Sequence, residues 1–421
     1  MTASTIGYDK VLRWVNTRLN GTHITVIQTI AWVVLCIIVA QRVTPAAVAR
    51  AIPAEESGSG RSRLRRARRW WLGPELDLGR LTPQLIRAAL TLLPRDQLIV
   101  VAMDTTRTIP WEIWQAGPTF AGHILPIAWA VIPYPWPKGR FRETTLGLIN
   151  QLQVAFPPGV RWSFVADRGF PSAELFARLR SAKTDWTVRL RLSDWTWVVG
   201  VYARVSEHLE AGRIKSGERL EATVGSVKSG LPETRASLVV TEVIPEPPKH
   251  KRNPGTERER AARAKAREWH LEHKGPKSTK PSKTARRYAR TWVLFTTAVT
   301  VEDAVRQYSL RMAIEETFRD WHHYWGLRMV AMSLASEGEV CRMVGAVSLA
   351  YLLQVELGWR LTQSELGKQR RAQWTVTDRV SLFWCGGQVF QDPGYDWSNW
   401  LAAQWDHLAS PESTDALALA A

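Results

Sequence analysis

Cysteine is scarce in this chain of 421 residues. The three cysteines (Cys36, Cys341 and Cys385) stand far apart, and no two of them form a Cys-x-x-Cys pair. This spacing supports neither a disulfide framework nor a zinc site built on thiolates. The chain also lacks an opening signal-peptide pattern and a lipidation motif. We therefore expect a protein that stays in a reducing cytoplasm.

Long apolar runs are equally rare. The one run that suggests a membrane lies in Ile24–Ala40, where residues 30–40 are continuously apolar. Eleven residues are too few to cross a bilayer, because a spanning helix needs about 20. We predict a buried helix of a helical domain and no membrane partner, with a membrane-surface protein as the weaker alternative.

Acidic residues are outnumbered. The chain has 39 Asp and Glu against 56 Lys and Arg, which gives a formal charge of +17 and a pI near 10.2. Such an excess points to a polyanionic partner. Since 45% of the residues are hydrophobic and 23% are charged, the chain is not wholly disordered. Its length suggests about two to four domains.

Two basic clusters account for much of this charge. The first is a stretch of arginines that contains no acid (Arg61, Arg63, Arg65, Arg66, Arg68 and Arg69). A solvated helix face usually mixes charges of both signs, so we favour phosphate contacts here. The second cluster, residues 247–290, carries fifteen basic and four acidic residues. We expect it to be a mobile basic arm, which could also serve as a nonspecific DNA tether.

The order of patterns along the chain predicts an α/β protein. Apolar, β-branched runs that alternate with amphipathic segments indicate strands and helices of one core. The expected strands are 98–103, 124–132, 162–166, 186–192 and 292–296, and the expected helices are 143–156, 172–180, one starting near 301, and 341–359. The predicted regions are a helical domain (1–95), the first half of the core (96–192), a β-rich insertion (193–246), the basic arm (247–290), the second half of the core (291–360), and a helical region with a tail (361–421).

Three carboxylates stand out within this organisation. Asp104 and Asp167 follow two buried strands, and open α/β sheets place their sites at such strand ends. Either aspartate alone would more often be a turn or cap residue. Together with Glu315 they provide the oxygen ligands that Mg²⁺ or Mn²⁺ prefers. Two such ions can assist in-line displacement at phosphorus, which is nuclease or strand-transfer chemistry.

Glu315 belongs to a helix with an unusual polar face. Tyr308, Arg311, Glu315, Arg319 and His322 follow one another at steps of 3, 4, 4 and 3. A helix of 3.6 residues per turn places residues at these steps on one face. We therefore expect a single carboxylate flanked by cationic and hydroxyl groups.

These residues resemble the DDE transposases of bacterial insertion sequences, in the group with a Tyr-x2-Arg-x3-Glu-x6-Lys signature. Tyr308, Arg311 and Glu315 match the signature, and Asp104-Thr-Thr and Asp167-Arg-Gly-Phe match the motifs of the first two acids. The resemblance implies a ribonuclease H-like core, a mixed sheet flanked by helices and interrupted by a mainly β insertion. It also implies an N-terminal all-helical DNA-binding domain and two bound divalent ions, Mg²⁺ or Mn²⁺.

The resemblance also implies roles for single residues. Asp104, Asp167 and Glu315 would be catalytic and hold the metal, and Tyr308, Arg311 and Arg319 would hold phosphates. Trp292 would stack on a flipped base, although it may equally be a core residue. His322 stands where the signature has lysine, so we expect His322→Lys to raise cleavage at neutral pH. The DNA-binding residues expected in the N-terminal cluster are Arg65, Arg66, Arg68 and Arg69.

The implied activity is cut-and-paste DNA transposition. The protein would cleave double-stranded DNA at the terminal inverted repeats of its own element and join the ends to target DNA, as a dimer in the DNA complex. Its expected location is the bacterial cytoplasm, in association with the nucleoid. The alternative is a catalytically inactive, domesticated transposase that only binds DNA; the presence of all three acids favours the enzyme.

Overall fold

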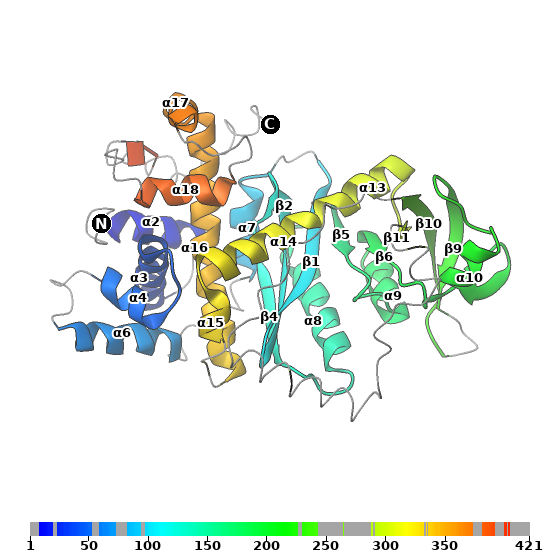
Figure 1. Cartoon of the computed structure of the whole chain (residues 1–421), viewed down its shortest axis with the longest axis horizontal. Helices are drawn as coiled ribbons and strands as arrows, with labels where there is room; N and C mark the ends of the chain where they lie inside the picture. Colours follow the sequence, from blue (N-terminus) through cyan, green and yellow to red (C-terminus); the bar gives the residue numbers. More distant parts are fainter. Residues whose placement is uncertain are drawn as a thin grey trace.

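The computed structural model describes most of the chain. The described residues are 8–19, 23–52, 59–72, 82–93, 97–225, 230–242, 264, 288, 291–331, 334, 336–373, 381–391, 400–401 and 403–404. Helices from both ends of the chain gather at one side of a long sheet, and residues 193–242 lie at the other side (Figure 1). The expected mixed α/β architecture is thereby confirmed. The predicted basic arm, residues 247–290, lies outside the described residues except at positions 264 and 288.

The first part of the chain is helical, as predicted. Its helices are α2 (Tyr8–Arg18), α3 (Ile24–Ala40), α4 (Pro45–Ala51), α6 (Gly60–Leu72) and α7 (Thr82–Leu90). The apolar helix α3 is largely buried. A buried carboxylate, Glu356, accepts hydrogen bonds from Trp14 Nε1 at 3.1 Å and from Arg18 Nη2 at 2.9 Å. These bonds fasten α2 to a helix near the other end of the chain.

Within the described residues, eleven strands form one mixed sheet. Its order is β3-β2-β1-β5-β6-β11-β10-β9-β7-β8, and β4 pairs with β2. Strands β1, β5 and β6 run parallel, whereas β2 and β11 pair antiparallel to their neighbours. The strands of the core are β1 (Ile99–Thr108), β2 (Trp111–Phe120), β3 (His123–Ile124), β4 (Ala128–Pro133), β5 (Trp162–Ala166), β6 (Asp185–Arg189) and β11 (Thr291–Thr296).

Strand β2 was not predicted from the sequence. Its Gly117-Pro118 pair resembles a turn signal. In the structure, a Cβ atom at Gly117 would lie 2.0 Å from the carbonyl oxygen of Leu125, so glycine permits a close approach of two backbones. Strand β1 is also longer than expected, because its antiparallel pairing with β2 continues through Asp104 to Thr108.

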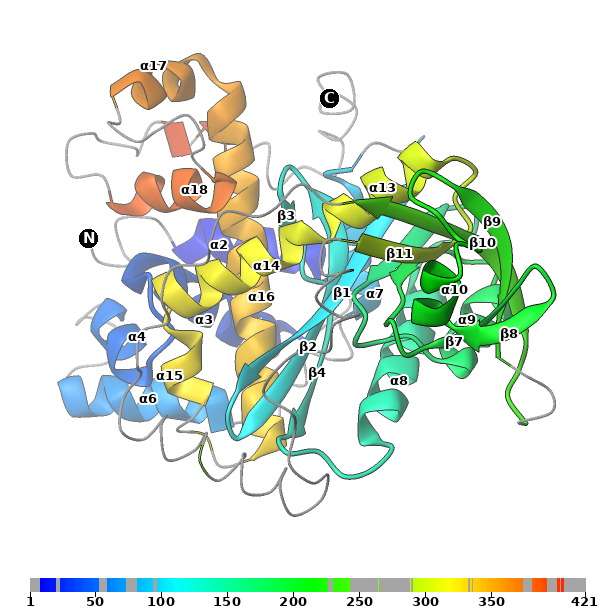
Figure 2. The same cartoon turned by 45° about the vertical axis from the view of Figure 1, so that its right-hand side comes forward.

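Residues 193–225 and 230–242 extend the core sheet instead of forming a sheet of their own, and the other residues of the predicted insertion (193–246) lie outside the described residues. Strands β7 (Trp195–Val198), β8 (Val201–Arg204), β9 (Arg219–Val224) and β10 (Thr234–Glu242) pair antiparallel, and β10 joins β11. Helix α10 (Val205–Glu210) lies among them (Figure 2). The mainly antiparallel character expected for this segment is thus present.

Helices cover both faces of the core sheet. The pair Thr105 and Trp114 points to one face, where Trp114 Nε1 donates to Thr145 of α8 at 3.4 Å. The adjacent pair, Asp104 and Gln115, points to the opposite face because side chains alternate along a strand. The remaining helical segments are α8 (Arg140–Ala155), α9 (Ala173–Ser181), α13 (Val301–Leu310), α14 (Met312–Arg319), the π-helical turn η3 (Asp320–Tyr324), α15 (Leu327–Ala331), α16 (Glu337–Gln363), α17 (Glu365–Gln373) and α18 (Leu382–Gln391).

Helix α16 is long, apolar and largely buried. It is the one described helix that is long and apolar enough to cross a membrane, and 89% of its apolar window is buried inside the protein. Helices α3 and α4 would qualify only together, and they are bent by 96°. Such burial is typical of the core helix of a folded domain.

Candidate active site

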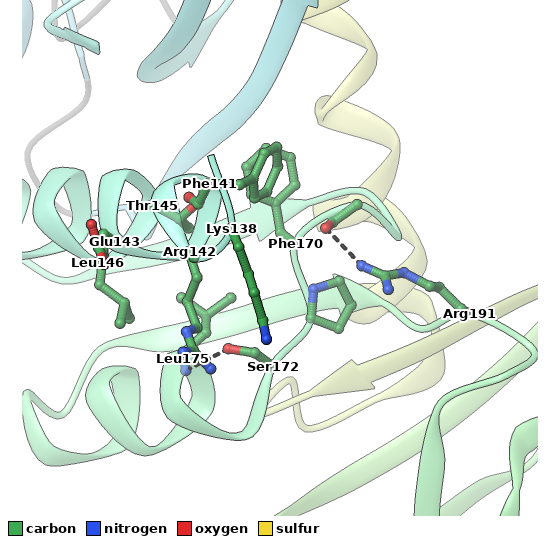
Figure 3. Close-up of a pocket in the computed structure, with 13 residues that line it drawn as sticks. Lys138, Phe141, Arg142, Glu143, Thr145, Leu146, Phe170, Ser172, Leu175 and Arg191 are labelled. Carbon is green, nitrogen blue, oxygen red and sulfur yellow. Dashed lines mark hydrogen bonds between the residues drawn. The ribbon is translucent and has the colours of Figure 1, made fainter. Parts of the chain in front are cut away.

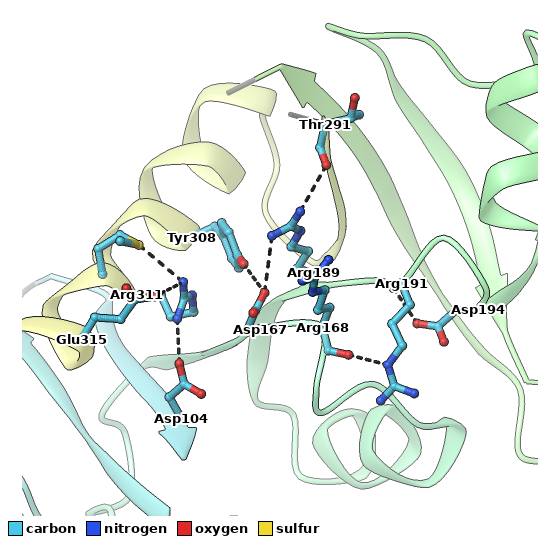
Figure 4. A network of polar contacts seen from close by, with 11 residues as sticks. Asp104, Asp167, Arg168, Arg189, Arg191, Asp194, Thr291, Tyr308, Arg311 and Glu315 are labelled. Atoms are coloured by element: carbon cyan, nitrogen blue, oxygen red, sulfur yellow. Dashed lines mark hydrogen bonds and ion pairs between the residues drawn. The ribbon is translucent and has the colours of Figure 1, made fainter. Parts of the chain in front are cut away.

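Two neighbouring parallel strands bring Asp104 and Asp167 together. The last pair in the ladder between β1 and β5 is Met103 with Ala166. Asp104 and Asp167 come directly after this pair in the chain, so both carboxylates lie where the parallel pairing of β1 and β5 ends (Figure 4). Asp167 follows the end of β5, as predicted. Asp104 lies within β1, at the point where only the parallel pairing ends.

The helical segment across this edge supplies the third acid. Helix α13 ends at Leu310, Arg311 follows, and α14 begins at Met312. Arg311 Nη1 donates to Asp104 Oδ2 at 2.7 Å, and Nη2 donates to Glu315 Oε1 at 2.9 Å. Tyr308 donates its hydroxyl proton to Asp167 Oδ1 at 2.8 Å. The structure therefore brings together five residues singled out from the sequence.

A buried amide holds α13 on the sheet. Gln307 Oε1 accepts hydrogen bonds from Ser163 of β5 and Thr187 of β6, both at 2.9 Å. Since Gln307 precedes Tyr308, these bonds help to position Tyr308 next to Asp167. Trp292 of β11 packs edge-on against the Tyr308 ring, with 4.7 Å between the centroids.

The pKa values of the two aspartates are shifted in opposite directions. The pKa of Asp104 is raised to about 6, mainly by burial and to a smaller extent by the charges of Asp167 and Glu315. Arg311 and the Thr105 N–H act in the opposite direction. Burial alone would also raise the pKa of Asp167. Hydrogen bonds from the Arg168 backbone and the Tyr308 hydroxyl, together with Arg311, instead lower that pKa.

Arg311 neutralises the acids in this arrangement. Its side chain is 7% exposed. Burial acts to lower its pKa, but Tyr308 and the three acids raise the pKa above the usual value. The guanidinium is therefore a fixed positive charge at the centre of the cluster.

The donor set fits a hard divalent cation by its chemistry. Asp104, Asp167 and Glu315 offer carboxylate oxygens, and the effect of Asp167 and Glu315 on the pKa of Asp104 shows that the three charges interact. In the part of the chain that the structure describes, no three Asp, Glu, His or Cys side chains are grouped closely enough to hold one ion. Arg311 lies between Asp104 and Glu315 and donates hydrogen bonds to both.

Arg319 and His322 lie outside the cluster of acids. Arg319 forms an ion pair with Glu316. His322 lies in η3, where its Nε2 is 2.8 Å from Thr106 Oγ1. Burial, Arg328 and His323 lower the pKa of His322 to about 4, so the ring is neutral at pH 7. Thr106 points to the same face of β1 as Asp104, and His322 therefore borders the site.

The arginines of the N-terminal cluster lie on α6, at the opposite side of the molecule from the insertion (Figure 1). Arg65, Arg68 and Arg69 are exposed. Arg66 is half-buried and its guanidinium lies 5.6 Å from the centre of the Trp32 ring. The structure does not bring these four residues to the acids, and their contact with DNA stays a prediction.

Two arginines near Asp167 were not singled out from the sequence. Arg189 Nη1 lies 3.7 Å from Asp167 Oδ1. Arg191 donates to the backbone oxygens of Arg168 at 2.5 Å and Gly169 at 2.8 Å, so it braces the loop after Asp167. Arg189 is the last residue of β6, the strand that pairs with β5, and Arg191 follows two residues later. Basic residues at the end of a strand next to a carboxylate-bearing strand are the signal that could have identified them.

Comparison with known proteins agrees with this geometry. A family model described as the transposase DDE domain matches residues 143–353, which include Asp167, Tyr308, Arg311 and Glu315. The match covers half of the chain. No curated protein matches the sequence.

Proposed function

Because the chain belongs to the transposase DDE domain family, we propose that it catalyses metal-dependent cleavage of DNA at the ends of a mobile element and transfer of the freed strand. The observation that carries this proposal is the convergence of Asp104, Asp167 and Glu315 on one edge of the sheet, with Arg311 joining two of them. The order of β2, β1, β5 and β6, with β1, β5 and β6 parallel, further supports a ribonuclease H-like core.

Asp104, Asp167 and Glu315 would hold the metal, which is Mg²⁺ or Mn²⁺ in this proposal. When bound, two such ions would activate the attacking oxygen and stabilise the leaving oxygen in displacement at phosphorus. A cationic neighbour stabilises the ionised form of Asp104, whose pKa burial raises to about 6. Arg311 supplies that positive charge in the structure described here.

The other residues of the site would bind and orient the DNA. Arg311 can present its planar donors to a phosphate when it leaves Asp104 and Glu315. The Tyr308 hydroxyl keeps Asp167 in place. Trp292 is partly exposed beside Tyr308, so one face of its indole ring can receive an unpaired base. Arg319, an exposed residue at the end of α14, is a proposed phosphate contact. His322, whose ring is neutral at pH 7, would be the weaker contact.

The proposed partners are the terminal inverted repeats of the protein's own element and a target duplex. The exposed arginines of α6 (Arg65, Arg68 and Arg69, with Arg66 behind them) would contact phosphates of the repeat. Joining two ends requires two active sites, so we propose a dimer in the DNA complex. Its location would be the bacterial cytoplasm, on the nucleoid.

A single comparison tests the activity. Wild type and Glu315→Gln would be incubated with Mg²⁺ or Mn²⁺ and a labelled duplex that contains the element boundary. We expect cleavage at the boundary by the wild type only, with equal DNA binding by both proteins. Arg306→Gln is the matched control, because Arg306 is an exposed residue on α13 that pairs with Asp303. It should cleave as the wild type does.

The second candidate is a transposase-derived protein that binds DNA without cleaving it. The observation that favours it is the Arg311 guanidinium between two of the acids, where a metal would be expected. Specific binding of the boundary duplex by the wild type, with no cleavage in either metal and no binding of Mn²⁺ to the DNA complex, would establish this candidate in place of the first.

A further inference from the structure

A basic groove leads away from Asp167 along the loop that follows it. Two adjoining hollows form this groove. One, of about 640 Å³, is lined by Asp167, Arg168 and Arg189 among others. The second, of about 620 Å³, is lined by Lys138 and Arg142 among others (Figure 3). Gly169 and Arg191 line both hollows, so the two lie side by side.

The charges along the groove are mainly positive. Five cations border it (Lys138, Arg142, Arg168, Arg189 and Arg191), whereas Asp167 and Glu143 are the acids among its lining residues. Arg142 is also paired with Glu174, at 2.6 Å. Lys138 makes no hydrogen bond or ion pair within the described part of the chain, so its ammonium group is available to a ligand.

The groove is held in shape by its own residues. Arg191 bonds to the backbone of Arg168 and Gly169, and its backbone N–H donates to Asp194 Oδ2 at 2.7 Å. Phe170 lies against Phe141, with 5.6 Å between the ring centroids, and both rings line the second hollow. The cations therefore sit on a fixed support, which reduces the entropy lost on binding.

We propose that this groove binds the sugar–phosphate backbone of one DNA strand, within a few nucleotides of the phosphate that lies at Asp167. The proposal rests on the proposed function for the identity of that phosphate. A strand that starts at Asp167 meets Arg168 and Arg191 first, and then Arg142 and Lys138. Regularly spaced phosphates suit a row of cations that begins at the acids, and no sequence readout is needed.

The test compares Lys138→Ala/Arg142→Ala with the control Lys215→Ala/Arg235→Ala. The control residues are exposed and belong to the region that extends the core sheet. Their substitution removes two positive charges, as the groove variant does. Affinity for the boundary duplex would be measured by fluorescence anisotropy without divalent ions, so that nothing is cleaved. One phosphate at a time would be replaced by an uncharged methylphosphonate, and the salt concentration would be varied.

We expect the groove variant to lower the salt slope of binding by about 1 for each lost phosphate contact. We also expect methylphosphonates near the boundary to weaken the wild type and the control about tenfold, but the groove variant less than about twofold, as coupled contacts do. An unchanged slope, or equal effects of every methylphosphonate in all three proteins, would overturn the groove. The groove would also be overturned if the groove variant responded less than the wild type only to methylphosphonates far from the boundary.

The two proposals fail separately in this design. Cleavage is measured in another assay with Mg²⁺ or Mn²⁺, and its absence in the wild type would count against the enzyme alone. Binding and phosphate coupling need no metal. Melting temperatures of both double variants should match the wild type, since all four substituted residues are exposed.

Discussion

Arg311 and Asp104 form a largely buried ion pair, with 2.7 Å between Nη1 and Oδ2 and side chains that are 7% and 21% exposed. The same guanidinium reaches Glu315 on the other side. One cation of the chain therefore balances two acids that are proposed to bind metal. Loss of this arginine should make the fold depend on an external cation.

Arg311→Ala should accordingly lower stability and increase the response to divalent ions. Removing one partner of a buried pair costs about 3 kcal/mol or more, because the other charge is left uncompensated. We expect a lower melting temperature in a chelator and a larger rise with Mg²⁺ than in the wild type. Arg306→Ala, on the exposed part of α13, is the control. Equal responses of all three proteins to Mg²⁺ would contradict this prediction.

Tyr308→Phe should weaken the anchoring of Asp167. The variant loses a hydrogen bond to a carboxylate, which we expect to reduce the free energy of unfolding by about 1.5 kcal/mol, while the ring still packs on Trp292. Cleavage should fall more than DNA affinity does. Tyr202→Phe is a matched control, since the Tyr202 hydroxyl has no hydrogen bond among the described residues. A wild-type rate in Tyr308→Phe would show that this bond does not matter.

His322→Lys should lower the melting temperature. Burial and the nearby Arg328 already reduce the pKa of this imidazole to about 4, and a lysine would place a full charge in the same environment. His322→Gln is the control, because it stays neutral and can keep the contact with Thr106. Faster cleavage by His322→Lys at neutral pH, with unchanged stability, would instead support the phosphate contact expected from the sequence.

A buried cluster behind α14 predicts a pH effect on stability. Burial raises the pKa of Asp320 to about 7, although Tyr351 donates a hydrogen bond to it at 2.9 Å. The folded protein therefore holds this proton more tightly than the unfolded chain does. Its contribution to stability is greatest below the usual aspartate pKa of about 4 and is lost as the pH rises to about 7. His123, whose pKa burial lowers to about 4, contributes in the opposite direction between about 4 and 6.5.

Asp320→Asn removes the first contribution and leaves the second. Relative to the wild type, the variant should therefore gain stability as the pH rises from about 4 to about 7, by up to about 4 kcal/mol over this range. Urea unfolding at several pH values measures this difference. A difference in stability that does not vary with pH would show that Asp320 is already charged in the folded protein.

The cluster of acids could be predicted because its signals are local. Apolar runs that end in Asp104 and Asp167 indicate two neighbouring buried strands, and the spacing of Tyr308, Arg311 and Glu315 follows the helical period. Each signal needs only a few consecutive residues. The structure shows that the local signals converge on one point.

The remaining features depend on contacts between distant segments. Arg191 matters because it reaches the backbone after Asp167; its place after a strand indicates that it lies near Asp167, but not that it bonds to this backbone. Strand β2 contains Gly117 because Leu125 passes close to it, which reads locally as a turn. The pairing of Arg319 with Glu316 competes with a phosphate contact in a way that spacing alone does not show.

The place of β11 has a consequence for biosynthesis. This strand is made after β6 and β10 but lies between them in the sheet. While the ribosome is still adding the residues that precede β11, both β6 and β10 have an unpaired edge, and such edges associate readily with other chains. The third acid, Glu315, emerges later still. A nascent or truncated chain that ends before Glu315 would thus be prone to aggregate and would lack the site that we propose to cut DNA.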